Sequence, residues 1–391
     1  MQSRTPTPRV AIACGGTGGH LFPGLAVADQ LRQRGCAVTL LISPKEVDQQ
    51  AVRTATGVQV ATLPAIGLNR GGWLAFARGF AQSYLATRKL FRIDPPAAVL
   101  AMGGFTSAPP ILAGKAFRAP TFLHESNTIP GRANRWLSWV TNQAFVGFPG
   151  ADARLHTRQV KVTGTPVRPQ FQPGDVAVCR LALGLDPEKP VLLVTGGSQG
   201  ASGLNDLVIQ ILPMLAMLAP GLQLFHLTGP NDIEKVEAAC ARHKIKALVR
   251  PFFAEMHLAL GAANVAISRA GASSLAEIAA MRIPSILVPF PAATDNHQYY
   301  NAQAFDKTGA ARLFEQKQAV PELLAPLVVD LLENLQVRGA MQASLAQWHA
   351  PHAAEKIAAS IVQAITDRRL AAGGVPVPSP SSLEHRQSVI S

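Results

Sequence analysis

Short runs of apolar residues alternate along the chain with longer stretches of helical periodicity, and glycine or polar turns separate the two. Such runs are typical of strands buried on both faces of a parallel sheet, and the longer stretches are typical of the helices that cover it. The predicted strands are 10–14, 38–42, 98–102, 121–124, 143–146, 191–195, 222–227, 265–268 and 285–288. The pattern predicts an α/β fold with parallel sheets covered on both faces.

Two glycine-rich loops hold the same place in the two halves of this pattern. One begins at Gly15 and the other at Gly196, and each follows a predicted strand and opens a predicted helix. Small residues let the backbone approach a ligand, and the free N–H groups of a helix N-terminus favour anionic oxygens. Each loop could also be only a tight turn, but the repetition favours two Rossmann-like domains that bind a phosphorylated ligand.

Composition narrows the class of protein. The chain has 391 residues, of which 48% are hydrophobic and 15% charged, with a net charge of +12. A single core stops growing near roughly 250–300 residues, so two domains are expected. The four cysteines lie far apart, which argues against a disulfide framework or a cysteine zinc site and fits a reducing cytosol. The basic charge points to a polyanion or an anionic membrane surface as a partner.

The sequence predicts neither a targeting segment nor a membrane-spanning segment. The polar residues 1–8 lead directly into a strand, so no signal peptide is expected. The least charged stretch, 207–231, is interrupted by prolines and a glycine, and we interpret it as a buried helix followed by a strand.

The first glycine loop looks like a dinucleotide-binding fingerprint but departs from it at two points. A G-x-G-x-x-G motif that starts at Gly16 needs a glycine where the chain has Leu21. The acidic residue expected after the second strand is also missing, since Ile42 is followed by a Ser-Pro-Lys sequence. An NAD-dependent oxidoreductase is therefore disfavoured.

Polar side chains gather beside the first loop and at the end of the fourth predicted strand. His20 lies where the first helix begins, and a neutral imidazole there can accept a proton at neutral pH. The sequence His124-Glu125-Ser126-Asn127 offers hydrogen-bonding groups at a strand's carboxyl end, which suits a polyhydroxyl substrate. His20 could instead bond only locally, and the His-Glu pair could simply cap the next element. No HExxH motif or carboxylate cluster follows, so no protein-held metal is predicted.

The second half repeats this arrangement. Residues 268–277 form a polar, small-residue turn between a strand and a helix, and Glu277 could accept hydrogen bonds from two ribose hydroxyls. Residues 295–298 form a polar cluster that opens the next helix. Ordinary helix capping would also explain each piece taken alone.

These segments together resemble one family of enzymes. The motifs are GGTGGHLFPGLAVA (15–28), GGF (103–105), HESN (124–127), TPVR (165–168), GGSQGA (196–201), SRAGASSLAE (268–277) and DNHQYYNA (295–302). In this order, from about residue 9 to residue 370, they are similar to the MurG family of N-acetylglucosaminyltransferases of peptidoglycan synthesis. Ser126 and Phe105 stand where that family commonly has Gln and Tyr.

The resemblance implies a GT-B glycosyltransferase fold, in which two facing Rossmann-like domains with parallel sheets hold the active site in the cleft. The expected N-terminal, acceptor- and membrane-associating domain is 9–168, to which a C-terminal helix at 352–370 returns. The expected UDP-GlcNAc-binding domain is 169–351, and a disordered tail is expected at 371–391 because that segment is rich in Gly, Pro and Ser.

The resemblance also implies roles for individual residues. His20 is the expected general base, with Glu125 as the alternative. The expected substrate-binding residues are Thr17, Gly18, Gly19, His124, Asn127, Arg168, Ser198, Gln199, Phe253, Ala272, Ser273, Ser274, Leu275, Ala276, Glu277 and Gln298. Among them, Phe253 is expected over the uracil, Glu277 near the ribose and Arg168 near the diphosphate.

Residues 73–92 combine a wide apolar surface with basic charge, and residues 70–118 carry half of the chain's net charge. At about 100° per residue, the helix has an aromatic stripe and an adjoining stripe of leucine and alanine. The stripes are Trp73, Phe76, Phe80 and Tyr84, and Leu74, Ala81 and Leu85. We expect the leucine stripe to face the core and Trp73, Phe76 and Phe80 to contact an anionic membrane surface. A helix with both stripes in the core is the alternative.

The implied reaction is the inverting transfer of GlcNAc from UDP-GlcNAc to the C4 hydroxyl of undecaprenyl-diphospho-MurNAc-pentapeptide, from lipid I to lipid II. No cofactor or protein-held metal is expected, because backbone amides and Arg168 can stabilise the departing diphosphate. The expected partners are UDP-GlcNAc, the lipid-linked acceptor, an anionic membrane surface and unidentified cell-wall synthesis proteins, but no nucleic acid. The expected location is peripheral, on the cytoplasmic face of the plasma (inner) membrane. The alternatives are a transferase with a soluble acceptor and a non-catalytic nucleotide-sugar-binding protein.

Overall fold

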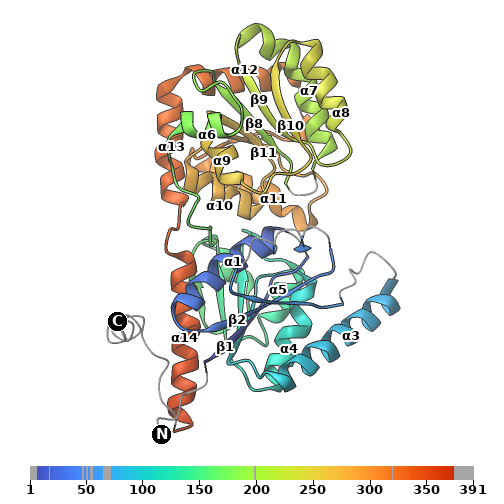
Figure 1. Cartoon of the computed structure of the whole chain (residues 1–391), viewed down its shortest axis with the longest axis vertical. Coiled ribbons are helices and arrows are strands. Elements are labelled where there is room, and N and C mark those ends of the chain that lie inside the picture. Colours follow the sequence, from blue (N-terminus) through green and yellow to red (C-terminus); the bar gives the residue numbers. More distant parts are fainter. Residues whose placement is uncertain are drawn as a thin grey trace. The chain divides into compact units, whose positions relative to one another are not determined.

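The chain divides into two compact units (Figure 1). Unit 1 comprises Met1–Arg168 and Pro351–Ser391, and unit 2 comprises Pro169–Ala350. The computed structural model describes residues 7–16, 18–45, 48–49, 52, 56–64, 72–197, 200–318 and 320–373, without the side chains of Trp73 and Gln318. From residue 374 onward, the expected tail lies outside the described residues.

Unit 1 is built on a parallel sheet with the strand order β3-β2-β1-β4-β5-β6-β7. Its strands are β1 (Arg9–Ala13), β2 (Ala37–Ile42), β3 (Gln59–Thr62), β4 (Ala98–Ala101), β5 (Thr121–Glu125), β6 (Gln143–Val146) and β7 (Val160–Val162). Its helices are α1 (Gly18–Gln33), α3 (Gly72–Ile93), α4 (Ala108–Ala116), α5 (Arg132–Leu137) and α14 (Ala353–Ala371), with short 3-10 turns η2 (Phe105–Ser107) and η3 (Ala151–Arg154). The helices α1 and α14 pack on one face of the sheet, and α3, α4 and α5 pack on the other.

Unit 2 is built on a second parallel sheet, with the order β10-β9-β8-β11-β12-β13. Its strands are β8 (Val191–Thr195), β9 (Gln223–Leu227), β10 (Lys246–Arg250), β11 (Val265–Ser268), β12 (Ser285–Leu287) and β13 (Arg312–Leu313). Its helices are α6 (Val176–Ala182), α7 (Ser202–Leu218), α8 (Ile233–Arg242), α9 (Met256–Ala262), α10 (Ala272–Met281), α11 (His297–Lys307), α12 (Pro321–Glu333) and α13 (Leu335–Trp348), with 3-10 turns η4 (Thr294–Asn296) and η5 (Gln316–Gln318). The two predicted parallel sheets are thus confirmed.

The first strand of each unit lies inside its sheet, at the point where the order of the strands reverses. In unit 1, β1 lies between β2 and β4, and in unit 2, β8 lies between β9 and β11. Ligands of open parallel sheets bind outside the carboxyl ends of the strands at this switch point. The glycine loops that follow β1 and β8 therefore lie where the topology places a ligand, each within its own unit.

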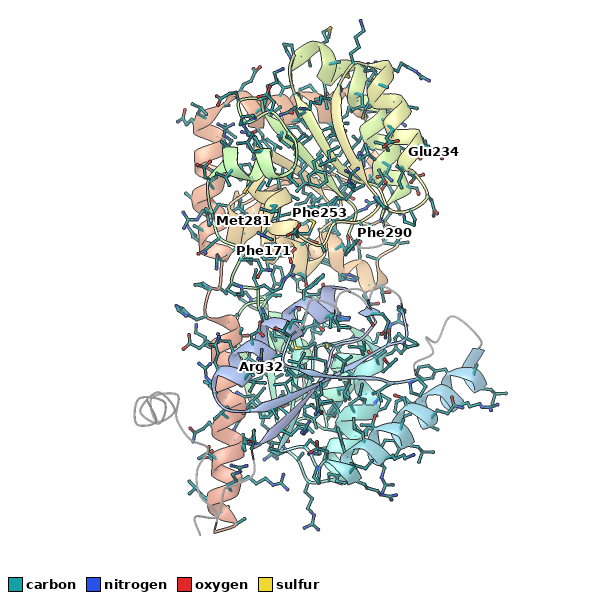
Figure 2. All side chains as sticks on the ribbon, in the orientation of Figure 1. Arg32, Phe171, Glu234, Phe253, Met281 and Phe290 are labelled. Atoms are coloured by element: carbon teal, nitrogen blue, oxygen red, sulfur yellow. The ribbon has the colours of Figure 1, made fainter. Side chains whose placement is uncertain are left out.

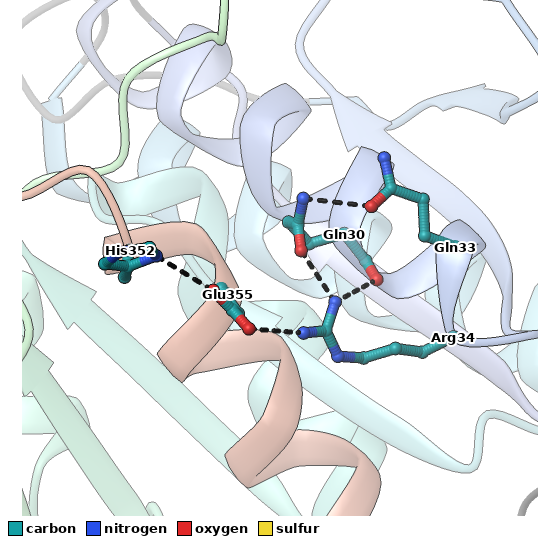
Figure 3. A network of polar contacts seen from close by, with 5 residues as sticks. All are labelled: Gln30, Gln33, Arg34, His352 and Glu355. Carbon is teal, nitrogen blue, oxygen red and sulfur yellow. Dashed lines mark hydrogen bonds and ion pairs between the residues drawn. The ribbon is translucent and has the colours of Figure 1, made fainter. Parts of the chain in front are cut away.

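The last helix, α14, packs against α1 in unit 1, which confirms the predicted return of the chain. Its buried isoleucines Ile357, Ile361 and Ile365 belong to the core cluster that also contains Leu21 of α1. A surface network joins the two helices, because Glu355 contacts Arg34 at 3.4 Å and His352 at 3.0 Å (Figure 3). Exposed pairs of this kind contribute only about 0–1 kcal/mol, so the buried isoleucines dominate this contact.

Four strands of the structure are missing from the sequence prediction, and all four lie at the edges of the sheets. They are β3, β7, β10 and β13. Edge strands face solvent on one side, and most residues in these four are exposed or half-buried, so they form no continuous apolar run. Across the described part of the chain, none of the helices combines the length and apolar character needed to cross a bilayer.

Candidate active site

The first glycine loop is held by the segment that follows β2. A Cβ atom at Gly15 would lie 2.4 Å from the backbone nitrogen of Ser43, so only glycine fits there. The buried carboxylate of Asp48 accepts the N–H of Gly16 at 2.7 Å, and the N–H and hydroxyl of Ser43 at 3.2 and 2.5 Å. Lys45 donates to the carbonyl of Gly16 at 2.7 Å. These contacts could not be predicted from the sequence, because neither Asp48 nor Lys45 belongs to a recognisable motif.

The helix α1 begins at Gly18, directly after this loop, and presents its first N–H groups at the switch point. Gly18 is buried and Gly19 is exposed, whereas Thr17 lies outside the described residues. Arg168, the last residue of unit 1, lies over the ring of Phe22 on the same helix, with its guanidinium carbon 4.3 Å from the ring centre. The loop, α1 and Arg168 therefore form one region with positive potential.

His20 is half-buried on the first turn of α1, against the backbone of the Gly103-Gly104 turn that follows β4. A Cβ atom at Gly103 would lie 2.9 Å from His20 Nε2, and one at Gly104 would lie 3.2 Å from its Cε1. Both glycines have positive φ, at 117° and 78°. The GGF motif therefore provides both the backbone shape and the space that the imidazole needs.

Glu125 ends β5 and organises the loop that follows. One carboxylate oxygen accepts the backbone and side-chain N–H groups of Asn127 at 2.8 and 3.0 Å. The other accepts the N–H of Gly131 and the side-chain amide of Asn134, both at 2.9 Å. Glu125 is 2% exposed. These four bonds make Glu125 an anchor of the loop that carries Asn127, and they occupy the oxygens that a general base would use.

The side chain of His124, which was expected to bind substrate, contacts protein groups in the structure. Its side chain is fully buried, with Nε2 3.1 Å from the carbonyl of Gly164 and Nδ1 3.2 Å from the hydroxyl of Ser126. Burial, together with the nearby His20, lowers its pKa from 6.5 to about 4, although the Gly164 bond opposes this shift. The neutral ring donates to Gly164 and accepts from Ser126, so His124 links β5 to the residue directly before the TPVR segment.

The depressed pKa of His124 predicts a pH-dependent stability. Between pH 6.5 and pH 4 the unfolded chain takes up a proton that the folded protein excludes, so stability is lost as the pH falls through this window. The contribution is roughly 3 kcal/mol. His226 of unit 2, whose pKa burial lowers to about 3, acts in the same direction.

Urea unfolding measured from pH 7.5 to pH 4 checks this expectation. His124→Gln, whose amide can still donate to Gly164, should remove about one proton from the pH dependence of the free energy of unfolding. The matched change His352→Gln, at an exposed histidine, should leave it intact. An unchanged slope in His124→Gln would contradict the assignment.

The candidate site of unit 2 is formed by the loops that follow β8, β10, β11 and β12, which end at the same edge of the sheet. Gly200 has a φ of 71°, and a Cβ atom there would lie 2.3 Å from the carbonyl oxygen of Thr228. Ser198 and Gln199 lie outside the described residues. Phe253, labelled in Figure 2, follows β10 and is half-buried. Its ring packs edge-on against the ring of Phe225, with ring centres 5.3 Å apart.

The helix α10 brings most of the second motif to this edge. Ser273, Ser274, Ala276 and Glu277 are half-buried on its first turns, where side chains can reach a ligand. Ala272 is 7% exposed, so it can offer a ligand little more than its backbone. Leu275, also expected to bind substrate, is fully buried, and its side chain belongs to the core. A contact of Leu275 with substrate would therefore have to come from its backbone.

Two internal contacts that the sequence analysis did not predict hold this edge together. Arg269 is 6% exposed and donates from Nη1 to the carbonyls of Val288 and Pro289 at 3.0 and 3.1 Å, and burial lowers its pKa to about 10. The buried Asn301 of α11 donates to the carbonyl of Ala270 at 3.1 Å. Both motifs, SRAG and DNHQYYNA, thus contribute to one packed loop assembly.

The entry to α11 has an unusual backbone. Asp295 and Asn296, consecutive non-glycine residues, both have a φ of 52°, in the left-handed region. Gln298 follows them, half-buried, and its side-chain oxygen accepts the N–H of Phe290 at 3.0 Å. Such strained turns persist where the surrounding structure fixes them, and they are common at binding sites.

The structure shows which described side chains of α3 are exposed and which face the core. Phe80 and Tyr84 pack against the core of unit 1, and Phe76 is half-buried with its ring 6.2 Å from that of Phe80. By contrast Leu74 and Leu85, expected in the core, are 83% and 62% exposed. The side chain of Trp73 lies outside the description.

Within the described residues, no group of three or more His, Cys, Asp or Glu side chains is placed to hold a metal ion.

Two family descriptions match the chain. Residues 10–146 match the glycosyltransferase family 28 N-terminal domain, and residues 191–359 match the glycosyltransferase family 28 C-terminal domain. The matches begin with β1 and β8, and each includes the glycine loop of its unit. The structure of MurG from Acinetobacter baumannii superposes with a TM-score of 0.70 at 27% identity, covering 92% of this chain and all of that one. A UDP-glucosyltransferase from Polygonum tinctorium, at 17% identity and a TM-score of 0.67, supports the GT-B fold alone.

Curated relatives give a finer assignment. A UDP-N-acetylglucosamine–N-acetylmuramyl-(pentapeptide) pyrophosphoryl-undecaprenol N-acetylglucosamine transferase from Anaeromyxobacter dehalogenans is 35% identical over 371 residues, 90% of this chain and 91% of the relative. The enzyme of the same name from Microcystis aeruginosa is 38% identical over 345 residues, 87% of this chain and 92% of the relative. The chain therefore belongs to the MurG family of N-acetylglucosamine transferases, a group of glycosyltransferases with the GT-B fold.

Proposed function

We propose that this protein transfers GlcNAc from UDP-GlcNAc to the C4 hydroxyl of undecaprenyl-diphospho-MurNAc-pentapeptide, with inversion at C1, in peptidoglycan synthesis. The observation that carries the proposal is the identity of 35–38% with transferases of that name along about nine-tenths of both chains. The structure supports it independently, because each unit has a glycine loop at the switch point of a parallel sheet, where nucleotide ligands bind.

His20 is the proposed general base. An unprotonated ring nitrogen takes the proton of the acceptor hydroxyl while that oxygen forms a bond to C1 of GlcNAc, and the bond from C1 to the diphosphate oxygen breaks with its electron pair on UDP. The helix N-terminus beside His20 favours the neutral, basic form of the ring. Glu125 is proposed as a positioning residue, because both of its oxygens already accept hydrogen bonds.

The departing UDP develops negative charge, and fixed donors stabilise it. The N–H groups of Gly18 and Gly19 at the start of α1 and the guanidinium of Arg168 are the proposed donors from unit 1. Thr17 is a further proposed donor of unit 1, and Ser198 and Gln199 are the proposed diphosphate-binding residues of unit 2. These groups supply positive potential without a protein-held metal, so turnover is expected to survive exhaustive chelation of divalent cations.

Unit 2 is proposed to hold the donor nucleotide. Phe253 offers an aromatic face to the uracil, and Glu277 accepts bonds from the ribose hydroxyls. Gln298 and Asn127 are proposed to bind hydroxyl and acetamido groups of GlcNAc, because each is half-buried beside a strand's carboxyl end and carries an amide. Further contacts come from the first turn of α10, from Ala272, Ser273, Ser274 and Ala276.

The acceptor is lipid-linked, and we propose that α3 contacts the cytoplasmic face of the plasma membrane. The exposed face of α3 includes Leu74, Arg78, Leu85, Lys89, Arg92 and Ile93. The whole helix carries four basic residues and no acidic one. On the same side of the sheet, Trp136 and Trp139 are 51% and 67% exposed. Apolar, aromatic and cationic side chains together suit the interface of an anionic bilayer.

Replacing Leu74 and Leu85 with serine is expected to weaken binding to phosphatidylglycerol vesicles by roughly 100-fold or more, since burial of each exposed leucine side chain in a bilayer contributes about 1.5–3 kcal/mol. The matched control replaces two exposed leucines of unit 2, Leu323 and Leu335, with serine. Vesicle sedimentation measures both variants. Equal losses in the two variants would contradict the proposed contact.

The reaction itself is tested by incubating the purified protein with UDP-GlcNAc and a short-chain polyprenyl-diphospho-MurNAc-pentapeptide. The proposal expects UDP release that depends on this acceptor. A protein that binds UDP-GlcNAc but releases no UDP would be a binding module. Equal turnover with the same sugar-peptide lacking the lipid diphosphate would indicate a soluble acceptor.

A further inference from the structure

Unit 1 has a hollow at the end of its sheet opposite the glycine loop. It encloses about 380 Å³ and is lined by Lys115, Arg118, Ala119, Pro120, Asn142 and Arg368. These residues come from the C-terminal end of α4, the start of β5, the loop before β6 and the last turn of α14. Strands β5 and β6 begin here, so the hollow is remote from the carboxyl ends where the proposed catalytic residues lie.

The lining of this hollow is strongly cationic. Lys115, Arg118 and Arg368 enter none of the ion pairs found among the described residues, and the acidic Asp94 that ends the α3 segment is paired with Arg9. Asn142 accepts the N–H and hydroxyl of Thr121 through Oδ1 at 2.9 and 3.1 Å, so its N–H₂ group remains as a donor. Every charged or amide group of the lining is therefore able to donate to an anion.

Helix dipoles oppose this positive charge but do not cancel it. Lys115 and Arg368 lie in the last turns of α4 and α14, where each helix carries about half a negative charge. Two helix ends offset about one of the three cations. The hollow therefore keeps a net charge of about +2, which is sufficient to attract the singly charged phosphodiester of an anionic lipid.

Arg118 occupies a backbone position that favours glycine. Its φ is 56°, just beyond the C-terminal end of α4, where a left-handed residue closes the helix. Lys244, beyond the end of α8, has nearly the same conformation with a φ of 54°. The favourable interaction of a cation with the C-terminal end of a helix is enough to explain Arg118 and Lys244 individually. Arg118 differs in that two further cations, from α4 and α14, line the same hollow.

The exposed face of α3 leads to this hollow. Phe91 in the last turn of α3 packs edge-on against Phe117, the neighbour of Arg118, with ring centres 6.0 Å apart. The helix has 22 residues, so it extends about 33 Å from the carboxyl edge of the sheet to the amino edge. A bilayer that lies along this face would therefore bring lipid headgroups to the hollow.

We propose that the hollow binds the phosphate group of an anionic lipid headgroup, as a second anchor that orients unit 1 on the membrane. Two guanidinium groups can bind phosphate oxygens in pairs, with Lys115 as a third charge and Asn142 as a neutral donor. The inference rests on the proposed membrane contact of α3 but not on the identity of the acceptor or on turnover.

The test compares two charge-matched triple variants of the full-length protein. The hollow variant carries Lys115→Ser, Arg118→Gly and Arg368→Ser, and the control carries Lys244→Gly, Lys246→Ser and Arg312→Ser in unit 2. Each cation at an anionic surface contributes roughly five-fold, so the hollow variant should lose roughly 100-fold in binding to vesicles of phosphatidylglycerol and phosphatidylcholine. The control should lose little. Arg118→Gly alone should be at least as stable as the wild type, because glycine adopts the left-handed conformation without strain.

Titration with inorganic phosphate distinguishes a lipid headgroup from free phosphate as the ligand of the hollow. Equal vesicle-binding losses in the hollow and control variants would overturn the proposal, because binding would then follow net charge alone. Phosphate binding that disappears in the hollow variant, with vesicle binding unchanged, would keep the phosphate site but overturn the lipid source. Turnover with a water-soluble, short-chain acceptor should be unchanged in both variants, so failure of the proposed reaction is recognised separately.

Discussion

Replacing His20 with alanine is expected to lower kcat by about 10²- to 10⁴-fold, because a positioned general base contributes this much to proton transfer. The KM for UDP-GlcNAc should change little, since His20 is proposed to act on the acceptor hydroxyl. Steady-state UDP release at varied UDP-GlcNAc and acceptor concentrations separates the two parameters. The variant should also lose the acidic limb of the pH–rate profile, which a merely structural role of the ring would leave in place.

The matched control for this variant is His352→Ala, at an exposed histidine directly before α14 that contacts Glu355 (Figure 3). It should keep normal turnover. Near-normal kcat in His20→Ala, with the acidic limb retained, would show that another group accepts the proton.

Replacing Glu125 with glutamine is expected to destabilise unit 1 by about 2–6 kcal/mol. The glutamine amide keeps one accepting oxygen, but its N–H₂ group must face two of the four donors that now bond to Glu125. Each donor left unsatisfied in a buried site costs about 1–3 kcal/mol. Urea unfolding at pH 7.5 measures the loss as a lower transition midpoint.

Glu355→Gln is the matched control, since this exposed carboxylate takes part in surface pairs worth about 0–1 kcal/mol. It should hardly change the midpoint. A Glu125→Gln protein that unfolds like the wild type but has lost turnover would identify Glu125 as the base, contrary to the role proposed here.

The inner part of each sheet could be predicted from the sequence, and the edges could not. Strands such as β6 and β8, buried on both faces, appear in the sequence as continuous apolar runs at the predicted positions. The edge strands β3 and β10 have exposed or half-buried residues at most positions, so their sequences look like loops. Their place depends on pairing with β2 and β9, which is a long-range interaction that a local pattern does not contain.

The orientation of α3 could not be predicted from the sequence, for a related reason. Periodicity separates the stripes of an amphipathic helix but does not say which stripe meets the sheet. The buried face contains the polar residues Ser83 and Thr87, so it does not appear in the sequence as a continuous apolar stripe. The hydroxyl of Thr87 donates to the carbonyl of Ser83 at 2.7 Å, so the helix itself satisfies this buried group.

The motifs located both candidate sites but did not separate residues that reach a ligand from residues that support the loops. His124 and Leu275 lie within the motifs and are fully buried. Conversely, Asp48 lies in no motif and braces the first glycine loop. Side-chain burial and hydrogen bonding depend on neighbours distant in sequence, which explains both kinds of error.

The central claim is the transfer of one N-acetylhexosamine to a lipid-linked acceptor by this chain. The most direct measurement is mass spectrometry of the acceptor after incubation with UDP-GlcNAc and purified protein in excess chelator. The account predicts an acceptor heavier by one N-acetylhexosamine, formed in step with released UDP and nearly absent with His20→Ala. An unmodified acceptor despite demonstrated binding of UDP-GlcNAc would contradict the account.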